Sequence, residues 1–140
     1  MKVAFATNDM KRVDAHFGGA KNLAIYEISS GESRFLEAVQ FDREKVSLED
    51  GRHEDVEGDR LGEKIEALRG CSLLFVLAIG GPAAARVVNN RVHPVKLPAS
   101  EDILSVAGRV QIMLSGNPPP WLRKVLRDES QRMDFLDEDA

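Results

Sequence analysis

Apolar and polar positions divide the first forty residues into three short apolar runs separated by turn-forming residues. The runs are Val3–Thr7, Leu23–Ile28 and Arg34–Phe41, with Gly18-Gly19 and residues 29–32 between them. Short runs of this kind, bounded by glycine and serine, are typical of β-strands. Because the last connection is only a few residues long, the pattern predicts an antiparallel meander.

The pattern changes in the middle of the chain. Residues 42–59 are polar and acidic and predict a connection, whereas Leu61, Ile65 and Leu68 form an apolar stripe that predicts a helix over 59–68, stopped by Gly70. A strand over 72–79, a helix over 83–90 and a strand over 93–97 should follow. A strand–helix–strand crossover pairs its strands in parallel with a right-handed connection, so the sheet is expected to be mixed.

The last part of the chain predicts two more helical segments. Residues 101–114 suit a helix packed on the sheet, capped by Ser100 and ended by Gly116, and residues 121–127 suit one or two amphipathic turns after three prolines. We therefore expect an α/β fold with a single domain, a mixed five-stranded sheet flanked by helices, over residues 1–116. Residues 117–140 should form a Pro-rich break, a short helix and an acidic tail.

Composition narrows the class of protein. The longest apolar run, residues 73–79, is far shorter than the roughly 20 residues that a membrane-spanning helix needs. The N-terminus enters a strand pattern at once and lacks the features of a signal peptide, which predicts a cytoplasmic protein without a membrane partner. The one cysteine, Cys71, excludes an internal disulfide.

The net charge of −4 is unevenly distributed. Residues 128–140 hold six acids and one arginine, whereas residues 1–41 and 67–127 together hold thirteen bases and seven acids. The folded body is therefore mildly basic and suited to an anionic ligand, although scattered, solvated charges give the same balance. Nucleic-acid binding is not expected, because the basic residues are dispersed and the tail is acidic.

The segment Asp14-Ala15-His16-Phe17-Gly18 is the first candidate for chemistry. A neutral imidazole nitrogen of His16 can ligate a transition metal, and Asp14 can orient the ring by accepting its other proton. A surface or turn-stabilising histidine is the alternative. Cys71 lies where the predicted helix gives way to a buried strand, so its thiolate either faces a cleft or its thiol packs in the core.

Gly80-Gly81-Pro82 follows a strand and opens a helix, where free backbone NH groups favour an anion. Its alternative role is a tight turn into a helix start. Neither the phosphate-loop ending nor the dinucleotide spacing is present, and no hydrolase, metalloprotease or zinc motif appears. We therefore expect no enzymatic activity; a phosphate- or nucleotide-binding enzyme that uses this turn is an alternative hypothesis.

Taken together, the leading strand, the Asp14-x-His16-Phe17-Gly18 loop, the strand over 23–28 and the stretch from Gly70-Cys71 to Gly80-Gly81 resemble the dinitrogenase iron–molybdenum cofactor biosynthesis family, over residues 2–115. The Pro-Pro-Trp-Leu segment and the acidic tail resemble its branch of small carriers. The resemblance implies a ribonuclease H-like motif and a non-enzymatic carrier. It also implies that His16 binds the cofactor and that Cys71 is a second metal ligand.

The cargo implied is an iron–sulfur precursor cluster of the iron–molybdenum cofactor. The implied partners are the enzyme that builds the core cluster and the cofactor scaffold complex, with the nitrogenase itself as a further candidate. As a hypothesis, His16 and Cys71 hold the anionic cluster with help from Lys11, Arg12, Lys21 or Arg86, and sparse ligation permits handover. The alternative is a metal-free regulatory or protein-interaction domain that contacts a partner through the acidic tail and the Trp121 region.

Overall fold

The computed structural model describes residues 1–41 and 61–138, with side chains described as far as residue 131. Its centre is a five-stranded sheet in the order β4-β3-β1-β5-β6. The strands are β1 (Lys2–Thr7), β3 (Asn22–Ile28), β4 (Ser33–Gln40), β5 (Leu73–Val76) and β6 (His93–Lys96). Strands β1, β3 and β4 form an antiparallel meander, whereas β1, β5 and β6 run parallel. The predicted α/β fold with a mixed sheet is confirmed; the predicted acidic connection over 42–59 lies outside the described residues.

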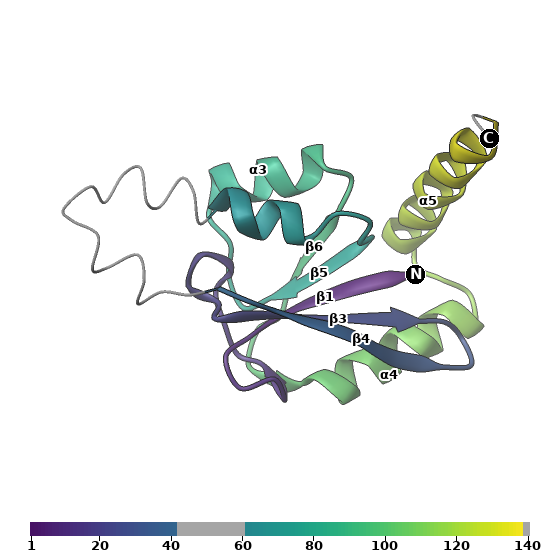
Figure 1. The fold of residues 1–140 in the computed structure, drawn as a ribbon. Coiled ribbons are helices and arrows are strands. Elements are labelled where there is room, and N and C mark those ends of the chain that lie inside the picture. The colour runs from purple at the N-terminus through teal and green to yellow at the C-terminus, as the bar shows by residue number, and fades with distance from the viewer. Residues whose placement is uncertain (42–60, 139–140) are drawn as a thin grey trace.

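Helices cover both faces of this sheet (Figure 1). The helical residues 61–67 and α3 (Gly81–Asn89) lie on one face, and α4 (Ile103–Ser115) lies on the other. A last helix, α5 (Pro120–Glu138), follows α4 along the chain. Two short strands, β2 (Arg12–Val13) and β7 (Glu101–Asp102), form a separate ladder, and a 3₁₀ turn, η1, spans Phe17–Gly19.

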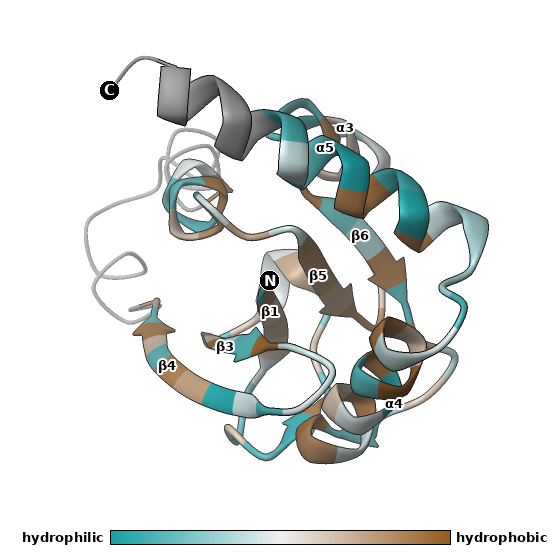
Figure 2. Cartoon of the chain, turned by 90° about the vertical axis from the view of Figure 1, so that its right-hand side faces the viewer, coloured by the Kyte–Doolittle hydropathy of each residue, from teal (hydrophilic) through white to brown (hydrophobic). Residues whose placement is uncertain are grey.

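The central strands are apolar on both faces because both faces are covered. On β1, Val3 and Phe5 belong to the core cluster beneath α4, whereas Ala4 and Ala6 belong to the cluster beneath α3. Phe5 stacks on Phe75 of β5 with a centroid distance of 5.4 Å. Figure 2 shows the result as a β5 that is hydrophobic along its whole length.

The predicted end of one strand and the predicted start of one helix were wrong, because residues at both places form backbone hydrogen bonds with distant segments. Strand β5 ends at Val76 rather than at 79, because the following residues leave the sheet and pair with another segment. Helix α4 begins at Ile103 rather than at 101, because Glu101 and Asp102 pair with β2; its N-cap is therefore Asp102 and not Ser100. The predicted stop at Gly70 is confirmed by a φ of +84°, a conformation that glycine adopts without strain.

Helix α5 is longer than the one or two turns predicted, and it is anchored to the body. Leu122 is fully buried in the core cluster beneath α4, and Trp121, Val125 and Leu126 pack against that cluster. The Ser72 hydroxyl, just before β5, donates a 2.6 Å hydrogen bond to the Glu129 carboxylate. The segment after the prolines therefore closes the amino end of the parallel strands. None of the helices in the described ranges combines the length and apolar character needed to cross a bilayer.

The anchoring of α5 can be tested by Leu122→Ala. We expect a loss of about 2–5 kcal/mol in the free energy of unfolding, because the substitution leaves a cavity in a packed core. The matched control is Leu104→Ala on α4, where the side chain is 68% exposed and the expected change is within about 0.5 kcal/mol. Urea unfolding measures both; equal effects would contradict the docking of α5.

Candidate functional site

The His16 segment lies beyond the carboxyl end of β5. Leu77 NH donates to Ala15 O at 3.0 Å and Phe17 NH donates to Ala78 O at 2.9 Å, so residues 15–17 run parallel to residues 77–79. Neighbouring Ala15 and Phe17 are buried, whereas His16 is exposed. The backbone is therefore fixed while the imidazole is presented to solvent.

Asp14 braces the loop that leads to this segment. Its Oδ1 atom accepts a 2.7 Å hydrogen bond from Asn8 NH, and the Asn8 side chain in turn accepts one from Lys21 NH at 3.0 Å. Among the described residues, no hydrogen bond joins the Asp14 carboxylate to the His16 ring. Asp14 therefore supports the position of the histidine through the backbone.

The preceding turn is organised by a second carboxylate. Asp9 Oδ1 accepts hydrogen bonds from Lys11 NH and Arg12 NH, both at 2.8 Å, and these bonds lower the Asp9 pKa below its usual value. The Arg12 side chain turns toward β7, where its Nε lies 3.8 Å from the Asp102 carboxylate. The Arg12 side chain therefore contacts the β2–β7 ladder and does not lie beside His16.

Lys64 was not identified from the sequence, yet it contacts the His16 segment directly. Its ammonium donates to Phe17 O at 3.1 Å and to Gly18 O at 2.7 Å, and the residue is only 2% exposed. A lysine beside an apolar stripe usually extends its amine into water, so its position carried no signal. Only the fold brings the helical residues 61–67 over residues 17–18.

The start of α3 lies next to the His16 segment. Residue 78, which pairs with His16, is two positions before Gly80, the N-cap of the helix. The first turn of a helix leaves backbone NH groups without intrahelical partners, and no described side chain caps α3. A Cβ added at Gly18, Gly80 or Gly81 would meet no other described group within 4 Å. His16, Gly18, Gly80 and Gly81 therefore form an open surface, which we call the His16 edge. The dipole of α3 makes the electrostatic potential at this surface locally positive.

The remaining predicted site residues are dispersed. Cys71 is fully buried in the core cluster beneath α3, and its NH donates to Leu68 O at 2.9 Å. Arg86 is exposed in the last turn of α3, about 7.5 Å along the helix axis from Gly81. Lys21 is exposed at the end of the loop braced by Asp14. Ligation by Cys71 stays a prediction and requires its turn to open.

The protein side chains do not assemble a conventional metal site at this edge. In the described ranges, no group of three or more histidine, cysteine, aspartate or glutamate side chains is placed to hold a metal ion. What the edge offers is one exposed imidazole, the NH groups at the start of α3, and a buried ammonium beneath the loop. Such a set fits an anion that brings most of its own ligands.

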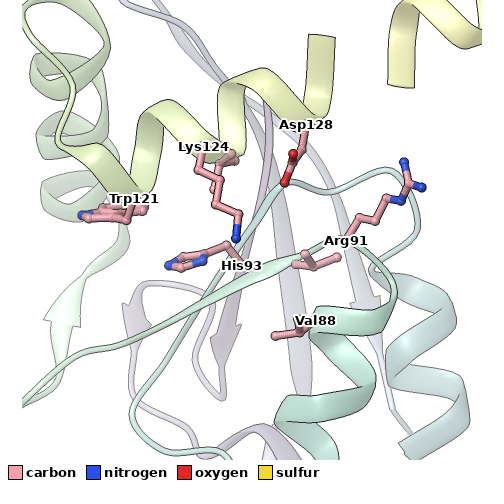
Figure 3. Close-up of a pocket in the computed structure, with 8 residues that line it drawn as sticks. Val88, Arg91, His93, Trp121, Lys124 and Asp128 are labelled. Carbon is pink, nitrogen blue, oxygen red and sulfur yellow. The ribbon is translucent and has the colours of Figure 1, made fainter. Parts of the chain in front are cut away.

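A second concave region lies at the opposite end of the sheet, between β6 and α5 (Figure 3). The His93 ring stacks on Trp121 at 5.1 Å with an interplanar angle of 14°, in a groove of about 160 Å³. Lys124, Arg91 and Asp128 also line it. Burial, followed by the nearby Lys124 ammonium, lowers the pKa of His93 below 6.5. Trp121 thus packs within the chain, although the alternative hypothesis uses its region to contact a partner.

Comparisons with known proteins identify similar chains. A family model described as "Dinitrogenase iron-molybdenum cofactor" matches residues 1–112. The chain is 49% identical over 126 residues to Protein NifX of Rhodobacter capsulatus, covering 90% of this chain and 77% of that protein. It is 30% identical over 132 residues to the FeMo cofactor biosynthesis protein NifB of Bradyrhizobium diazoefficiens, covering 85% of this chain but 25% of that protein.

Solved structures support the fold. The crystal structure of PH0822 superposes with a TM-score of 0.58 at 18% identity, covering 79% of this chain and 88% of that one. At this level of identity the likeness concerns the arrangement of the elements alone.

The lowered pKa of His93 predicts a pH dependence of stability. The unfolded chain binds a proton near pH 6.5 more readily than the folded one does, so His93 contributes its full stability above pH 6.5 and loses it as the pH falls through that value toward the lower folded pKa. We expect His93→Phe, which retains an aromatic ring against Trp121, to reduce the fall in unfolding free energy between pH 7.5 and pH 5.5. Urea unfolding at both pH values measures this fall. A fall in His93→Phe as large as in the unmodified protein would contradict the lowered pKa of His93.

Proposed function

Because the chain belongs to the dinitrogenase iron–molybdenum cofactor family, we propose that it binds iron–sulfur precursors of that cofactor at the His16 edge and passes them on during assembly. The family and the NifX relatives place the protein in iron–molybdenum cofactor biosynthesis. The observation that carries the finer proposal is the exposed His16, held by backbone pairing beside the uncapped start of α3.

The chemistry of this edge suits an iron–sulfur cargo. A neutral imidazole nitrogen is a good ligand for iron, and the NH groups at the start of α3 favour the negative charge of a sulfide-bridged cluster. The cluster brings its own bridging sulfides, so a single protein ligand leaves few bonds to break on release. Lys21 and Arg86, both exposed, add longer-range attraction for an anion. Asp14 holds the loop and does not touch the cargo.

Transfer of this kind requires no catalysis by the protein. Binding and release of an intact cluster change its ligation at one position, and the core of the cluster is neither built nor broken. We therefore place this protein among carriers rather than enzymes. The cargo-binding residues fall within residues 1–116, the part assigned to the carrier domain, and α5 serves to close the far end of the sheet.

The partners follow from the cargo. The protein would receive it from the enzyme that builds the core cluster and deliver it to the scaffold complex or to the nitrogenase. The similarity to part of NifB supports the first step, because a protein named for FeMo cofactor biosynthesis includes a region related to nearly the whole of this chain.

The role of His16 is tested by His16→Ala. Titration with iron–molybdenum cofactor isolated from dinitrogenase, followed by visible absorption under anoxic conditions, should show an affinity loss of about 10-fold or more, which corresponds to about 1.4 kcal/mol, since His16 is the proposed protein ligand. The control is His93→Phe, which changes a histidine at the opposite end of the sheet and should bind as the unmodified protein does. Unchanged affinity in a folded His16→Ala would refute the site and favour the metal-free interaction domain.

A second test separates binding from stability at α3. Gly81→Ala should stabilise the free protein by up to about 0.5 kcal/mol, because alanine is the better helix former, yet weaken cofactor binding by adding a methyl group at the open edge. Gly108→Ala, in α4 with equally open surroundings, should stabilise without affecting binding. Thermal unfolding and the same titration measure the two effects; equal binding by both variants would contradict a cargo seated on α3.

A further inference from the structure

Lys64 is a charged side chain in a place where burial is costly. It is 2% exposed and is among the largest fully buried side chains in the described part of the chain. An ammonium taken out of water is retained only where hydrogen bonds and favourable electrostatics compensate. Its Nζ atom donates to two successive carbonyl oxygens, Phe17 O and Gly18 O, and lies 5.3 Å from the centroid of the Phe41 ring.

These two carbonyls belong to the segment that presents His16. On one side, the segment is fixed by its backbone bonds to Leu77 and Ala78. On the other side, the turn after His16 is closed by a 3.1 Å bond from Gly19 NH to His16 O, and Lys64 binds the two carbonyls within that turn. The lysine therefore supplies the contact that sets how the turn, and with it the imidazole, projects from the sheet edge.

We propose that Lys64 is a positioning residue for cargo binding, which holds the His16–Gly18 turn in its binding conformation through its hydrogen bonds to Phe17 O and Gly18 O. This inference rests on the proposed function of the His16 edge. It assigns to Lys64 an action through His16 and no direct contact with the cargo.

The test is a double-mutant cycle of Lys64→Met and His16→Ala, read by the same anoxic titration with isolated iron–molybdenum cofactor. Methionine retains the length and packing of the lysine but removes its charge and hydrogen bonds. We expect Lys64→Met to lose about 10- to 100-fold in affinity, as is typical for residues that orient a metal ligand. In the His16→Ala background, Lys64→Met should lower the affinity by no more than about twofold, which is the deviation from additivity usual for residues that do not interact. Lys124→Met on α5, which removes an exposed charge at the other end of the sheet, is the control and should bind normally.

Hydrogen exchange provides a readout that needs no cargo. In Lys64→Met, the amides of Phe17 and Gly19 should exchange faster, whereas the amide of Val110 in the buried side of α4 should be unchanged. A general loss of protection would show that Lys64 acts on the whole fold and would overturn the proposal. If Lys64→Met does not fold, Lys64→Gln, whose neutral amide ends a side chain one atom shorter and cannot reach both carbonyls as the lysine does, takes its place in the cycle under the same criteria.

The outcomes separate the two proposals. A loss in His16→Ala with normal binding by Lys64→Met refutes the role of Lys64 alone. An equal loss on both backgrounds shows that Lys64 acts independently of His16 and also refutes it. Normal binding by His16→Ala refutes the proposed function and, with it, this use of the lysine.

Discussion

The pairing of residues 15–17 with residues 77–79 is the contact on which the site depends. The two segments are far apart in sequence, and they meet in an isolated parallel bridge between His16 and Ala78. Two backbone hydrogen bonds join them, so the histidine loop and the entry to α3 form one rigid edge. Without this pairing, His16 would be an exposed residue in a loop, and the NH groups of α3 would face solvent at an unrelated position.

The edge is unusual in what it leaves open. Gly18, Gly80 and Gly81 leave its surface open, while the buried Lys64 binds the backbone of the His16 turn from within the fold. Such a surface can attract an anionic ligand without enclosing it in a pocket. Such a surface suits the proposed carrier function, because a cargo that is bound by few ligands and is not surrounded can be passed to a partner directly.

The two ends of the parallel strands are used differently. The carboxyl end bears the open edge with His16, whereas α5 closes the amino end through Leu122, the Ser72–Glu129 hydrogen bond and the stack of His93 on Trp121. Of the histidines in the described residues, one is therefore exposed on an open edge and the other is packed against an aromatic ring. Their surroundings, rather than their residue type, distinguish a candidate ligand from a structural group.

The sequence by itself determined the antiparallel meander, the parallel crossover with its helix between β5 and β6, and the candidacy of His16, because period, turn residues and local spacing are local properties. It misplaced the end of β5 and the start of α4, since both depend on pairing with distant segments. It also could not assign Lys64 or the burial of Cys71. Whether a polar side chain beside an apolar stripe reaches water or a backbone carbonyl is decided by what packs above it, and only the tertiary structure places residues 17–18 there.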